Sequence, residues 1–280
     1  MSARDIALTP VTPMLGAEVH GADLTSMDDA QFEVLNEAFA THQVLFFRDQ
    51  PALTPAQQIA FGRRFGPLHE HPAAPHLEGH REIFVIHAHR ESKVANGNAW
   101  HTDVSCDAEP PMATMLQIHK LPPCGGDTLF ASMYAAYEAL SAPMQRFLCT
   151  LTAHHASEHI YRGRYADRGV DDAGRVYPSC DHPVVRKHPV TGRPALYVNR
   201  SFTTHINGLT PAESRGLLDF LLAHAERPEF QLRFTWTENA VALWDNRCLQ
   251  HFAMWDYWPH ERKGHRVTIK GDRPMGVTAS

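Results

Sequence analysis

Apolar residues recur along this chain with two different periods, and the changes between them predict short strands mixed with a few helices. Phe32, Leu35 and Phe39 lie at helical spacing, so they predict a helix over about 28–42 whose first turn is acidic. The uninterrupted apolar run Val44-Leu45-Phe46-Phe47 then predicts a short buried strand. The first part of the chain therefore combines both element types.

Two further helices are predicted from the signals at their N-termini. Thr54-Pro55-Ala56-Gln57 places an N-cap residue, a proline and a glutamine in the order that begins a helix, which we expect to end near Phe65. Thr210-Pro211-Ala212-Glu213 repeats this order and predicts a helix to about Glu226.

The rest of the chain is dominated by short strands. A strand and turn are expected within residues 1–25, two short helices at about 133–140 and 142–149, and strands at 83–87, 112–119, 128–132, 184–186, 195–198, 230–236, 241–244 and 267–270. Strands of this length and spacing are typical of a double-sheet jelly roll. We therefore expect a mainly β fold with flanking helices.

Two segments lack a regular pattern. Residues 68–100 are rich in His, Pro, Asn and Gly and predict a long functional loop around one strand, while the polar segment 160–182 predicts an insertion or lid. Because no change in composition marks a linker, we expect residues 1–280 to form a single domain.

Composition and charge exclude several classes of protein. The chain of 280 residues is 43% hydrophobic with a formal net charge of −5, so it has no basic footprint for nucleic acid. It has no apolar run near the ~18 residues of a membrane span, and its first residues lack the apolar core of a signal peptide. Five cysteines without a CxxC pair indicate reduced thiols, hence a cytoplasmic protein. We expect a homo-oligomer, a dimer or a tetramer, with a small-molecule substrate.

His101 and Asp103 are the first candidate metal ligands. On an extended segment, residues i and i+2 point to the same face, so both side chains could reach one ion. Two His and one carboxylate are the facial set of non-haem iron enzymes and leave positions for a co-substrate and O₂. His251, far downstream, could supply the third ligand if a jelly roll brings its strand beside His101. Taken alone, His101 and Asp103 are better explained as a surface ion pair, and only the downstream motif favours metal binding.

Two arginines follow the third candidate ligand. Arg262 and Arg266 come eleven and fifteen residues after His251. Guanidinium groups are permanently charged and grip carboxylates through two hydrogen bonds. Two such groups near a metal suit two anions, a keto acid and an anionic substrate.

These motifs together resemble the iron(II)- and 2-oxoglutarate-dependent taurine dioxygenase family, which includes herbicide-degrading and alkylsulfatase members. The resemblance covers nearly the whole chain and is carried by Trp100-His101-Thr102-Asp103, Gly125-Gly126-Asp127-Thr128 and Trp244-Asp245-Asn246-Arg247 with His251, Arg262 and Arg266. It implies a double-stranded β-helix, a cupin-like jelly roll. It also implies that Fe(II) is held by His101, Asp103 and His251, and that Thr128 and Arg262 hold the distal carboxylate of 2-oxoglutarate. O₂ would be the other co-substrate, and succinate and CO₂ would be released.

The resemblance carries over to the substrate pocket only in part. The contacts to the sulfonate in the taurine enzyme correspond to His71, Arg266 and the N–H of Val104 here. The contacts to the amine correspond to Ala74 and Gly97, which have no acceptor in their side chains. A small sulfonate, sulfate or carboxylate without an ammonium tail is therefore expected.

Several alternatives follow from the same residues. Asn96 or Asn98 could supply the missing acceptor, which would make this a taurine dioxygenase proper. An aryloxyalkanoate or alkylsulfate dioxygenase would use the same iron site. A metal-binding sensor without turnover is the alternative from a different class.

Overall fold

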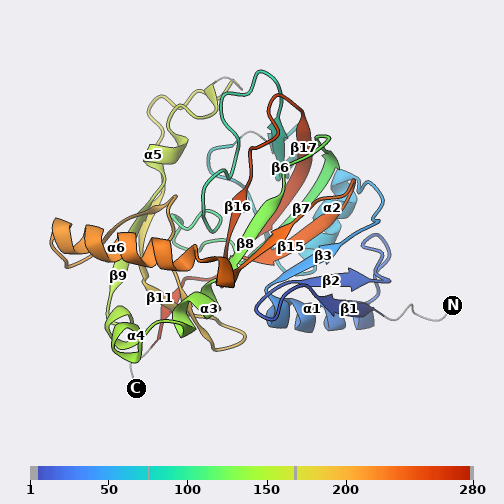
Figure 1. Ribbon diagram of the computed structural model, residues 1–280. Coiled ribbons are helices and arrows are strands. Elements are labelled where there is room, and N and C mark those ends of the chain that lie inside the picture. The colour runs from blue at the N-terminus through green and yellow to red at the C-terminus, as the bar shows by residue number, and fades with distance from the viewer. Residues whose placement is uncertain (1–5, 75, 167–168, 278–280) are drawn as a thin grey trace.

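The computed structural model describes residues 6–74, 76–166 and 169–277. Two β-sheets pack face to face and helices cover their outer sides, which confirms the predicted jelly roll (Figure 1). Nine strands of the described chain form the large sheet, and all neighbours in it are antiparallel except β2 and β3. Their order across the sheet is β1 (Ala7–Pro10), β2 (Ala17–His20), β3 (Val44–Phe47), β15 (Val241–Asp245), β7 (Ala113–Lys120), β17 (Arg262–Ile269), β6 (His80–Ala88) and β5 (His76–Leu77), with β4 (Leu68–His69) paired to β17.

The small sheet provides the facing layer. Its antiparallel strands are β14 (Gln231–Phe234), β8 (Thr128–Ser132) and β16 (Leu249–Ala253), in that order. Aromatic side chains from both sheets fill the space between them, and Phe46 stacks on Phe234 with 4.0 Å between ring centroids. Burying such rings is the main stabilisation of this layer. This packing places β16, which carries His251, opposite β17, which carries Arg262 and Arg266.

Two helices cover the outer face of the large sheet. Helix α1 (Asp29–His42) begins with a capping box in which Asp28 accepts a hydrogen bond from the N–H of Gln31. Helix α2 (Pro55–Arg63) has the predicted capping box of Thr54 and Gln57. The buried side chains of α1 pack on β3 and β15, and α2 packs on β17 and β6. Both helices therefore pack on the face of the large sheet that points away from the small sheet.

The remaining elements form a second layer beside the jelly roll (Figure 1). They comprise β10 (Ser179–Pro183), β9 (Thr152–Ala156) and β13 (Thr203–Ile206) in one sheet, β12 (Pro194–Leu196), β11 (Val185–Lys187) and β18 (Met275–Gly276) in another, and the helices α3 (Met133–Glu138), α4 (Ala142–Leu148), α5 (Glu158–Tyr161) and α6 (Pro211–Ala225) with a 3₁₀ turn at Pro228–Phe230. Helix α6 begins with the predicted capping box of Thr210 and Glu213.

The structure corrects several predicted boundaries. The last long strand begins at Arg262 instead of 267, because its alternating charged residues hid the strand pattern. The predicted strand 230–236 is a 3₁₀ turn followed by the shorter β14. Strands β9, β13 and β16 were not predicted, since their polar and histidine residues break the apolar alternation. The loop 68–100 also contains β4 and β5.

The polar segment 160–182 is only partly irregular. It begins at the end of α5 and finishes in β10, an edge strand that pairs with β9. Between these elements the described residues form turns. Its role as a lid stays a prediction.

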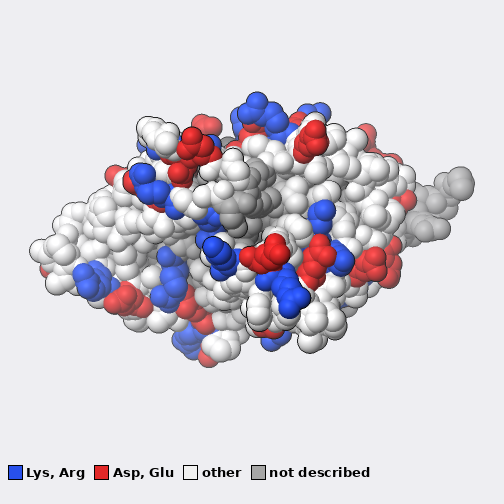
Figure 2. Space-filling model, turned by 90° about the horizontal axis from the view of Figure 1, so that it is seen from above, with Lys and Arg blue, Asp and Glu red and all other residues white. Residues whose placement is uncertain are grey.

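Charged side chains of both signs are interspersed on the face seen in Figure 2. No field of one sign extends over that face, so an anionic ligand has to be recognised by cations inside a cavity. Among the described residues, no helix is long and apolar enough to cross a membrane.

Candidate functional site

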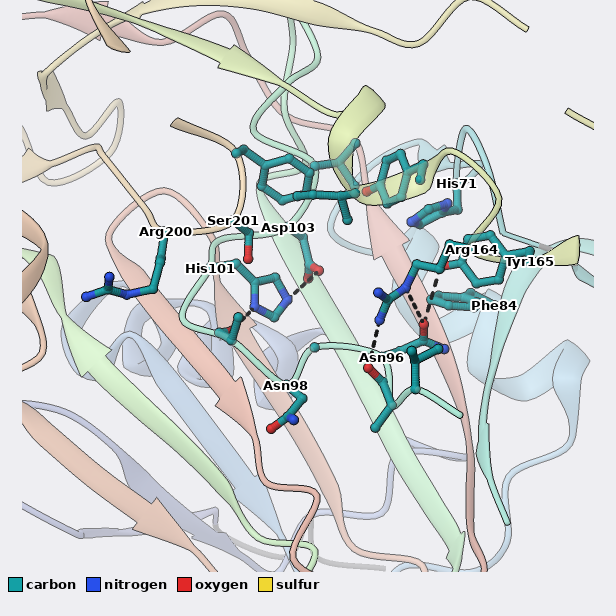
Figure 3. Close-up of a pocket in the computed structure, with 18 of the residues that line it drawn as sticks. His71, Phe84, Asn96, Asn98, His101, Asp103, Arg164, Tyr165, Arg200 and Ser201 are labelled. Atoms are coloured by element: carbon teal, nitrogen blue, oxygen red, sulfur yellow. Dashed lines mark hydrogen bonds and ion pairs between the residues drawn. The ribbon is translucent and has the colours of Figure 1, made fainter. Parts of the chain in front are cut away.

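A cavity of about 460 Å³ is lined by Phe84 from the middle of β6, by Arg266 from the middle of β17 and by residues of α5. Figure 3 shows part of its lining, with His101 and Asp103 between Arg164 and Arg200 in the view. The three residues predicted to meet the substrate anion all line it, namely His71, Val104 and Arg266. The structure therefore brings the predicted substrate contacts and two predicted metal ligands to one cavity.

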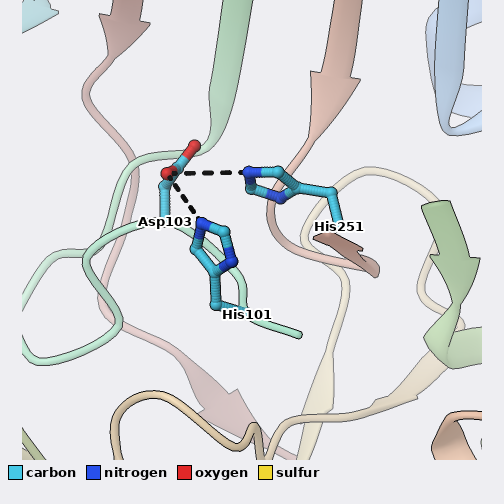
Figure 4. A group of neighbouring side chains, drawn as sticks. All are labelled: His101, Asp103 and His251. Atoms are coloured by element: carbon cyan, nitrogen blue, oxygen red, sulfur yellow. Dashed lines mark ion pairs between the residues drawn. The ribbon is translucent and has the colours of Figure 1, made fainter. Parts of the chain in front are cut away.

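The three predicted metal ligands meet at this cavity (Figure 4). The N–H of His251 on β16 donates to the carbonyl of His101 at 2.8 Å, and this bridge places the two imidazoles side by side. Asp103 Oδ1 lies 3.8 Å from His101 Nε2 and 3.9 Å from His251 Nε2. One ligand atom from each residue thus lies within 4.8 Å of the other two.

The hydrogen bonds around these ligands fit a cation. His101 Nδ1 lies 2.7 Å from the carbonyl of Ala99, which can only accept, so Nδ1 carries the hydrogen. The lone pair of His101 Nε2 is left facing the oxygen of Asp103. Two electron-rich atoms that face each other in a buried site are stabilised by a positive ion between them. The residues present therefore suit a divalent metal.

Asp103 is held by neighbours on three sides. Thr114 Oγ1 donates to Oδ2 at 2.7 Å, and Arg266 Nη1 donates to Oδ1 at 2.7 Å. Asn246 receives the N–H of Asp103 and donates to Thr114 Oγ1 at 2.9 Å. Burial of Asp103 would raise the pKa of its carboxyl, but the charge of Arg266, with the hydrogen bond from Thr114, outweighs burial and holds that pKa below its usual value. Asp103 is therefore ionised, which is the form that a metal ligand needs.

Both imidazoles are poised as neutral ligands. Burial lowers the pKa of His101, and burial together with the nearby His101 lowers the pKa of His251 well below its usual value. Neutral imidazole is the form that binds a metal.

A second cluster with metal-ligand residue types is a hydrogen-bond network instead. His188 Nδ1 accepts from two backbone N–H groups, so its Nε2 carries the hydrogen and donates to Asp245 at 3.0 Å. Arg247 donates to both carboxylate oxygens of Asp245, at 2.9 and 2.7 Å. His188 and Asp245 have no lone pair left for a metal, and burial raises the pKa of the third member, the Cys248 thiol, well above its usual value. This cluster therefore fixes the turn between β15 and β16.

Arg262 is a buried cation that lacks a matching anion. Its side chain is 3% exposed; Nε donates to the carbonyl of Gly126 at 3.1 Å, and Nη2 has no hydrogen-bond partner among the described residues. Burial lowers the pKa of Arg262, although a guanidinium keeps its charge. An unpaired buried charge is costly, and an anionic ligand would relieve that cost.

A smaller cavity connects Arg262 with two of the predicted metal ligands. It is lined by His101 and His251 at the ligand cluster and by Thr128 and Arg262 farther along β8 and β17. Thr128 Oγ1 accepts from the indole Nε1–H of Trp236 at 3.0 Å, so its hydroxyl hydrogen remains available to a ligand oxygen. This cavity therefore brings two predicted metal ligands and the two predicted carboxylate donors to one space.

The geometry of His71 makes it a hydrogen-bond donor to the larger cavity. Its Nδ1 accepts from the backbone N–H groups of Ala73 and Ala74, at 3.1 and 2.9 Å. Burial and the charge of Arg266 lower the pKa of His71 well below its usual value, so the ring is neutral. A neutral ring whose Nδ1 accepts carries its hydrogen on Nε2.

Val104 has a strained backbone. Its φ of 46° lies in the left-handed region, which β-branched residues rarely adopt. No hydrogen bond of the Val104 N–H occurs within the described part of the chain. Strain of about 1–3 kcal/mol at such a position is characteristic of functional sites. The left-handed backbone at Val104 turns the chain directly after Asp103.

The two departures from the taurine pattern lie in different surroundings. Ala74 is buried against Phe84, Tyr161 and neighbouring apolar residues. A Cβ on Gly97 would lie 3.2 Å from the ring of His101, so a side chain there would press on a metal ligand. Asn98 lines the larger cavity, while Asn96 Oδ1 lies within 3.4 Å of both Arg164 Nε and Tyr165 Oη.

Sequence reasoning missed three residues that shape the site. Thr114 supports Asp103 from the start of the apolar strand β7, where a threonine resembles a packing residue. Trp236 orients Thr128. Arg164 enters the larger cavity from a segment with no periodic pattern. Only the position of Trp236 near the predicted strand 230–236 offered a signal.

Comparisons with known proteins agree with this geometry. A model of the taurine catabolism dioxygenase TauD, TfdA family matches residues 7–268. The alpha-ketoglutarate-dependent sulfate ester dioxygenase of Pseudomonas putida is 34% identical over 98% of this chain and 93% of its own length. The alkylsulfatase of Acinetobacter baylyi is 33% identical over 98% of this chain and 88% of its own length.

A solved structure shares the whole fold. The crystal structure of a putative alpha-ketoglutarate-dependent taurine dioxygenase from Burkholderia xenovorans superposes with a TM-score of 0.85 at 37% identity. The superposition covers 99% of this chain and 96% of that chain.

Proposed function

Since this chain belongs to the taurine catabolism dioxygenase TauD, TfdA family and is a 2-oxoglutarate-dependent dioxygenase that acts on small anions, we propose that it uses Fe(II) to hydroxylate a sulfate ester or sulfonate. The proposed iron ligands are His101, Asp103 and His251. The proposed 2-oxoglutarate contacts are Thr128 and Arg262.

One observation carries the proposal. The small cavity has the imidazoles of the ligand cluster along one part and the unpaired Arg262 along another. A dicarboxylate keto acid has one end that can chelate a metal and one that needs a cation. The two requirements match the two parts of this cavity.

Bound iron would supply the activation of O₂, coupled to conversion of 2-oxoglutarate to succinate and CO₂. Arg262 would grip the distal carboxylate, and the Thr128 hydroxyl would donate to the same group. Trp236 keeps Thr128 in the rotamer that allows this donation. Asp103 stays ionised and correctly turned because Thr114 and Arg266 both donate to it.

The substrate anion would lie in the larger cavity. His71 can donate from Nε2, the Val104 N–H lies beside Asp103 in the strained turn, and Arg266 adds a guanidinium. Arg266 lines both cavities, so it can bind the substrate anion close to the iron. Holding the acid there would place the adjacent C–H bonds at the metal.

The remaining part of the larger cavity favours a substrate larger than taurine with no ammonium group. The cavity of about 460 Å³ is walled by Phe84, Tyr161 and Phe202. The Ala74 methyl and Gly97 provide no acceptor, so a buried ammonium would lose hydrogen bonds worth about 1–3 kcal/mol. The relatives named for sulfate esters and alkyl sulfates support this choice.

The segment 160–182 supports a role as a lid. Tyr161 and Tyr165 reach from it into the cavity wall and lie 5.2 and 6.5 Å from the ring of His71. All five cysteines are free, which supports a reducing, cytoplasmic location. A homo-oligomer, a dimer or a tetramer, stays a prediction.

The test measures succinate formation and substrate oxidation for a panel of candidate substrates. Alkyl sulfates, alkanesulfonates, an aryloxyalkanoate and taurine are compared at saturating Fe(II), 2-oxoglutarate and O₂. We expect one succinate per oxidised substrate, with a higher kcat/KM for the uncharged tails than for taurine. A higher kcat/KM for taurine would reverse the substrate assignment, and Ala74→Tyr should then have little effect.

A further inference from the structure

Arg164 is a cation in the larger cavity that the predicted reaction does not use. It lies in the turn after α5, and its Nη2 donates to the carbonyl of Ala95 at 2.7 Å (Figure 3). Its Nε lies 3.4 Å from Asn96 Oδ1. These contacts hold the guanidinium on the wall formed by residues 94–99.

The charge of Arg164 is not balanced by a carboxylate. Its acceptors are a carbonyl and an amide, and no described Asp or Glu forms an ion pair with it. Arg200, which also lines the cavity, forms a two-hydrogen-bond pair with Glu226 at 2.8 and 2.9 Å. Arg266 is paired with Asp103. Of the three arginines that line the cavity in the described chain, Arg164 therefore has the uncompensated charge.

Arg164 also removes an acceptor that a cationic substrate would need. The amide oxygen of Asn96 is approached by both Arg164 Nε and the hydroxyl of Tyr165. With this oxygen engaged, an ammonium tail would meet a guanidinium instead of an acceptor. A negatively charged tail would meet a donor that is already positioned.

We propose that Arg164 is a specificity-determining residue that selects a substrate with a second acidic group. The substrate class is a small organic dianion: one acid binds at His71, Val104 and Arg266, and a carboxylate or second sulfo group on the tail binds Arg164. The inference rests on the proposed function, because the first acid has to occupy the anion site. A second acidic group would also explain why the cationic Arg164 lies on the cavity wall, where the amide oxygen of Asn96 is not free to accept from an ammonium group.

The experiment measures binding separately from turnover. Alkanesulfonates of equal chain length that end in methyl, ammonium or carboxylate are titrated calorimetrically into the full-length protein with Fe(II) and 2-oxoglutarate, without O₂. The variants are Arg164→Gln, which removes the charge, and Arg164→Lys, which keeps it. Arg162→Gln is the matched control, because Arg162 lies in the same turn, pairs with Glu158 and does not line the cavity.

We expect the carboxylate tail to bind the wild type about tenfold more tightly than the methyl tail, and the ammonium tail to bind more weakly than either. Arg164→Gln should abolish the preference for carboxylate, Arg164→Lys should restore part of it, and Arg162→Gln should leave it unchanged. If Arg164 only fastens the lid, Arg164→Gln would weaken all three ligands equally, and this result would overturn the inference.

Failure of the inference can be separated from failure of the proposed function. If the methyl tail binds but the wild type shows no preference for carboxylate, the dianion is wrong and the anion site stands. If none of the three sulfonates binds, the anion site itself is wrong and the inference falls with it.

Discussion

Replacing Arg262 with Met should remove most of the stabilisation that 2-oxoglutarate gives to this protein. Methionine keeps most of the side-chain volume and deletes the buried charge. Arg262 as a whole residue is 3% exposed and its Nη2 has no hydrogen-bond partner among the described residues, so its guanidinium is positioned for an anion. Charge-assisted hydrogen bonds of this kind contribute about 1.5–3 kcal/mol, which corresponds to a roughly 10- to 150-fold weaker Kd.

The ligand-free protein should respond differently. Arg262→Met removes the cost of a buried unpaired cation but also removes the hydrogen bond to the carbonyl of Gly126. These two effects oppose each other, so the Tm without ligand should change by less than about 4 °C. Loss of ligand binding would then not be confused with loss of the fold.

The assay is thermal unfolding with a divalent metal, without O₂, with and without 2-oxoglutarate. At a concentration of about 100 times the wild-type Kd, the ligand stabilises the wild type by about 2.7 kcal/mol, or roughly 5–10 °C in Tm. With Kd raised roughly 10- to 150-fold, only about 0.3–1.4 kcal/mol remains. Arg63→Met is the control, because Arg63 is 61% exposed and pairs with Glu82 on the surface. A full shift in Arg262→Met would refute the role of Arg262.

Two further predictions concern residues that support the fold and the metal. Thr114→Val removes the hydroxyl that donates to Asp103 Oδ2, so it should weaken metal binding by about tenfold or more in a metal titration. Thr114→Ser keeps the hydroxyl and should bind the metal as the wild type does. Equal metal affinities in the wild type and Thr114→Val would show that Thr114 does not support the metal site. Burial, with the nearby His119, lowers the pKa of His265 to about 4, below the unfolded value near 6.5. The unfolded chain therefore binds more protons between these values, and stability should fall as pH drops from about 6.5 to 4. Urea midpoints at these pH values measure this loss, and His265→Gln should reduce it; an identical loss in the variant would assign it to other groups.

The sequence predicted those features whose signals are local. The capping boxes at Thr54 and Thr210 formed as expected. In each, the N-cap hydroxyl accepts from the backbone N–H three residues later, and the side chain of that later residue accepts from the N-cap backbone N–H. The grouping of His101, Asp103 and His251 had no local signal of this kind and was predicted from the resemblance to a known family, whose motifs are specific only when taken together.

The features that no local pattern could establish depend on contacts between distant segments, and the role of Arg262 in binding 2-oxoglutarate was predicted only through the resemblance to a known family. Arg262 lies in a long strand with three other basic or imidazole residues, and only pairing with β6 and β7 reveals which of them face the cavity. His101 and Asp103 do not lie on one regular strand: His101 bridges to His251, and the chain turns at Asp103. Thr114 acts through Asp103, which is 11 residues earlier in the chain but in direct contact.

The central claim is that His101, Asp103 and His251 hold an iron that couples 2-oxoglutarate to substrate oxidation. The most direct test measures succinate formed by the wild type and by His251→Ala, each purified without metal and supplied with Fe(II), 2-oxoglutarate, O₂ and an alkyl sulfate. We predict that the wild type forms succinate only when Fe(II) is added, and that His251→Ala forms almost none while its far-UV circular dichroism is unchanged. Succinate formation by the wild type without iron, or at an undiminished rate in His251→Ala, would contradict the claim.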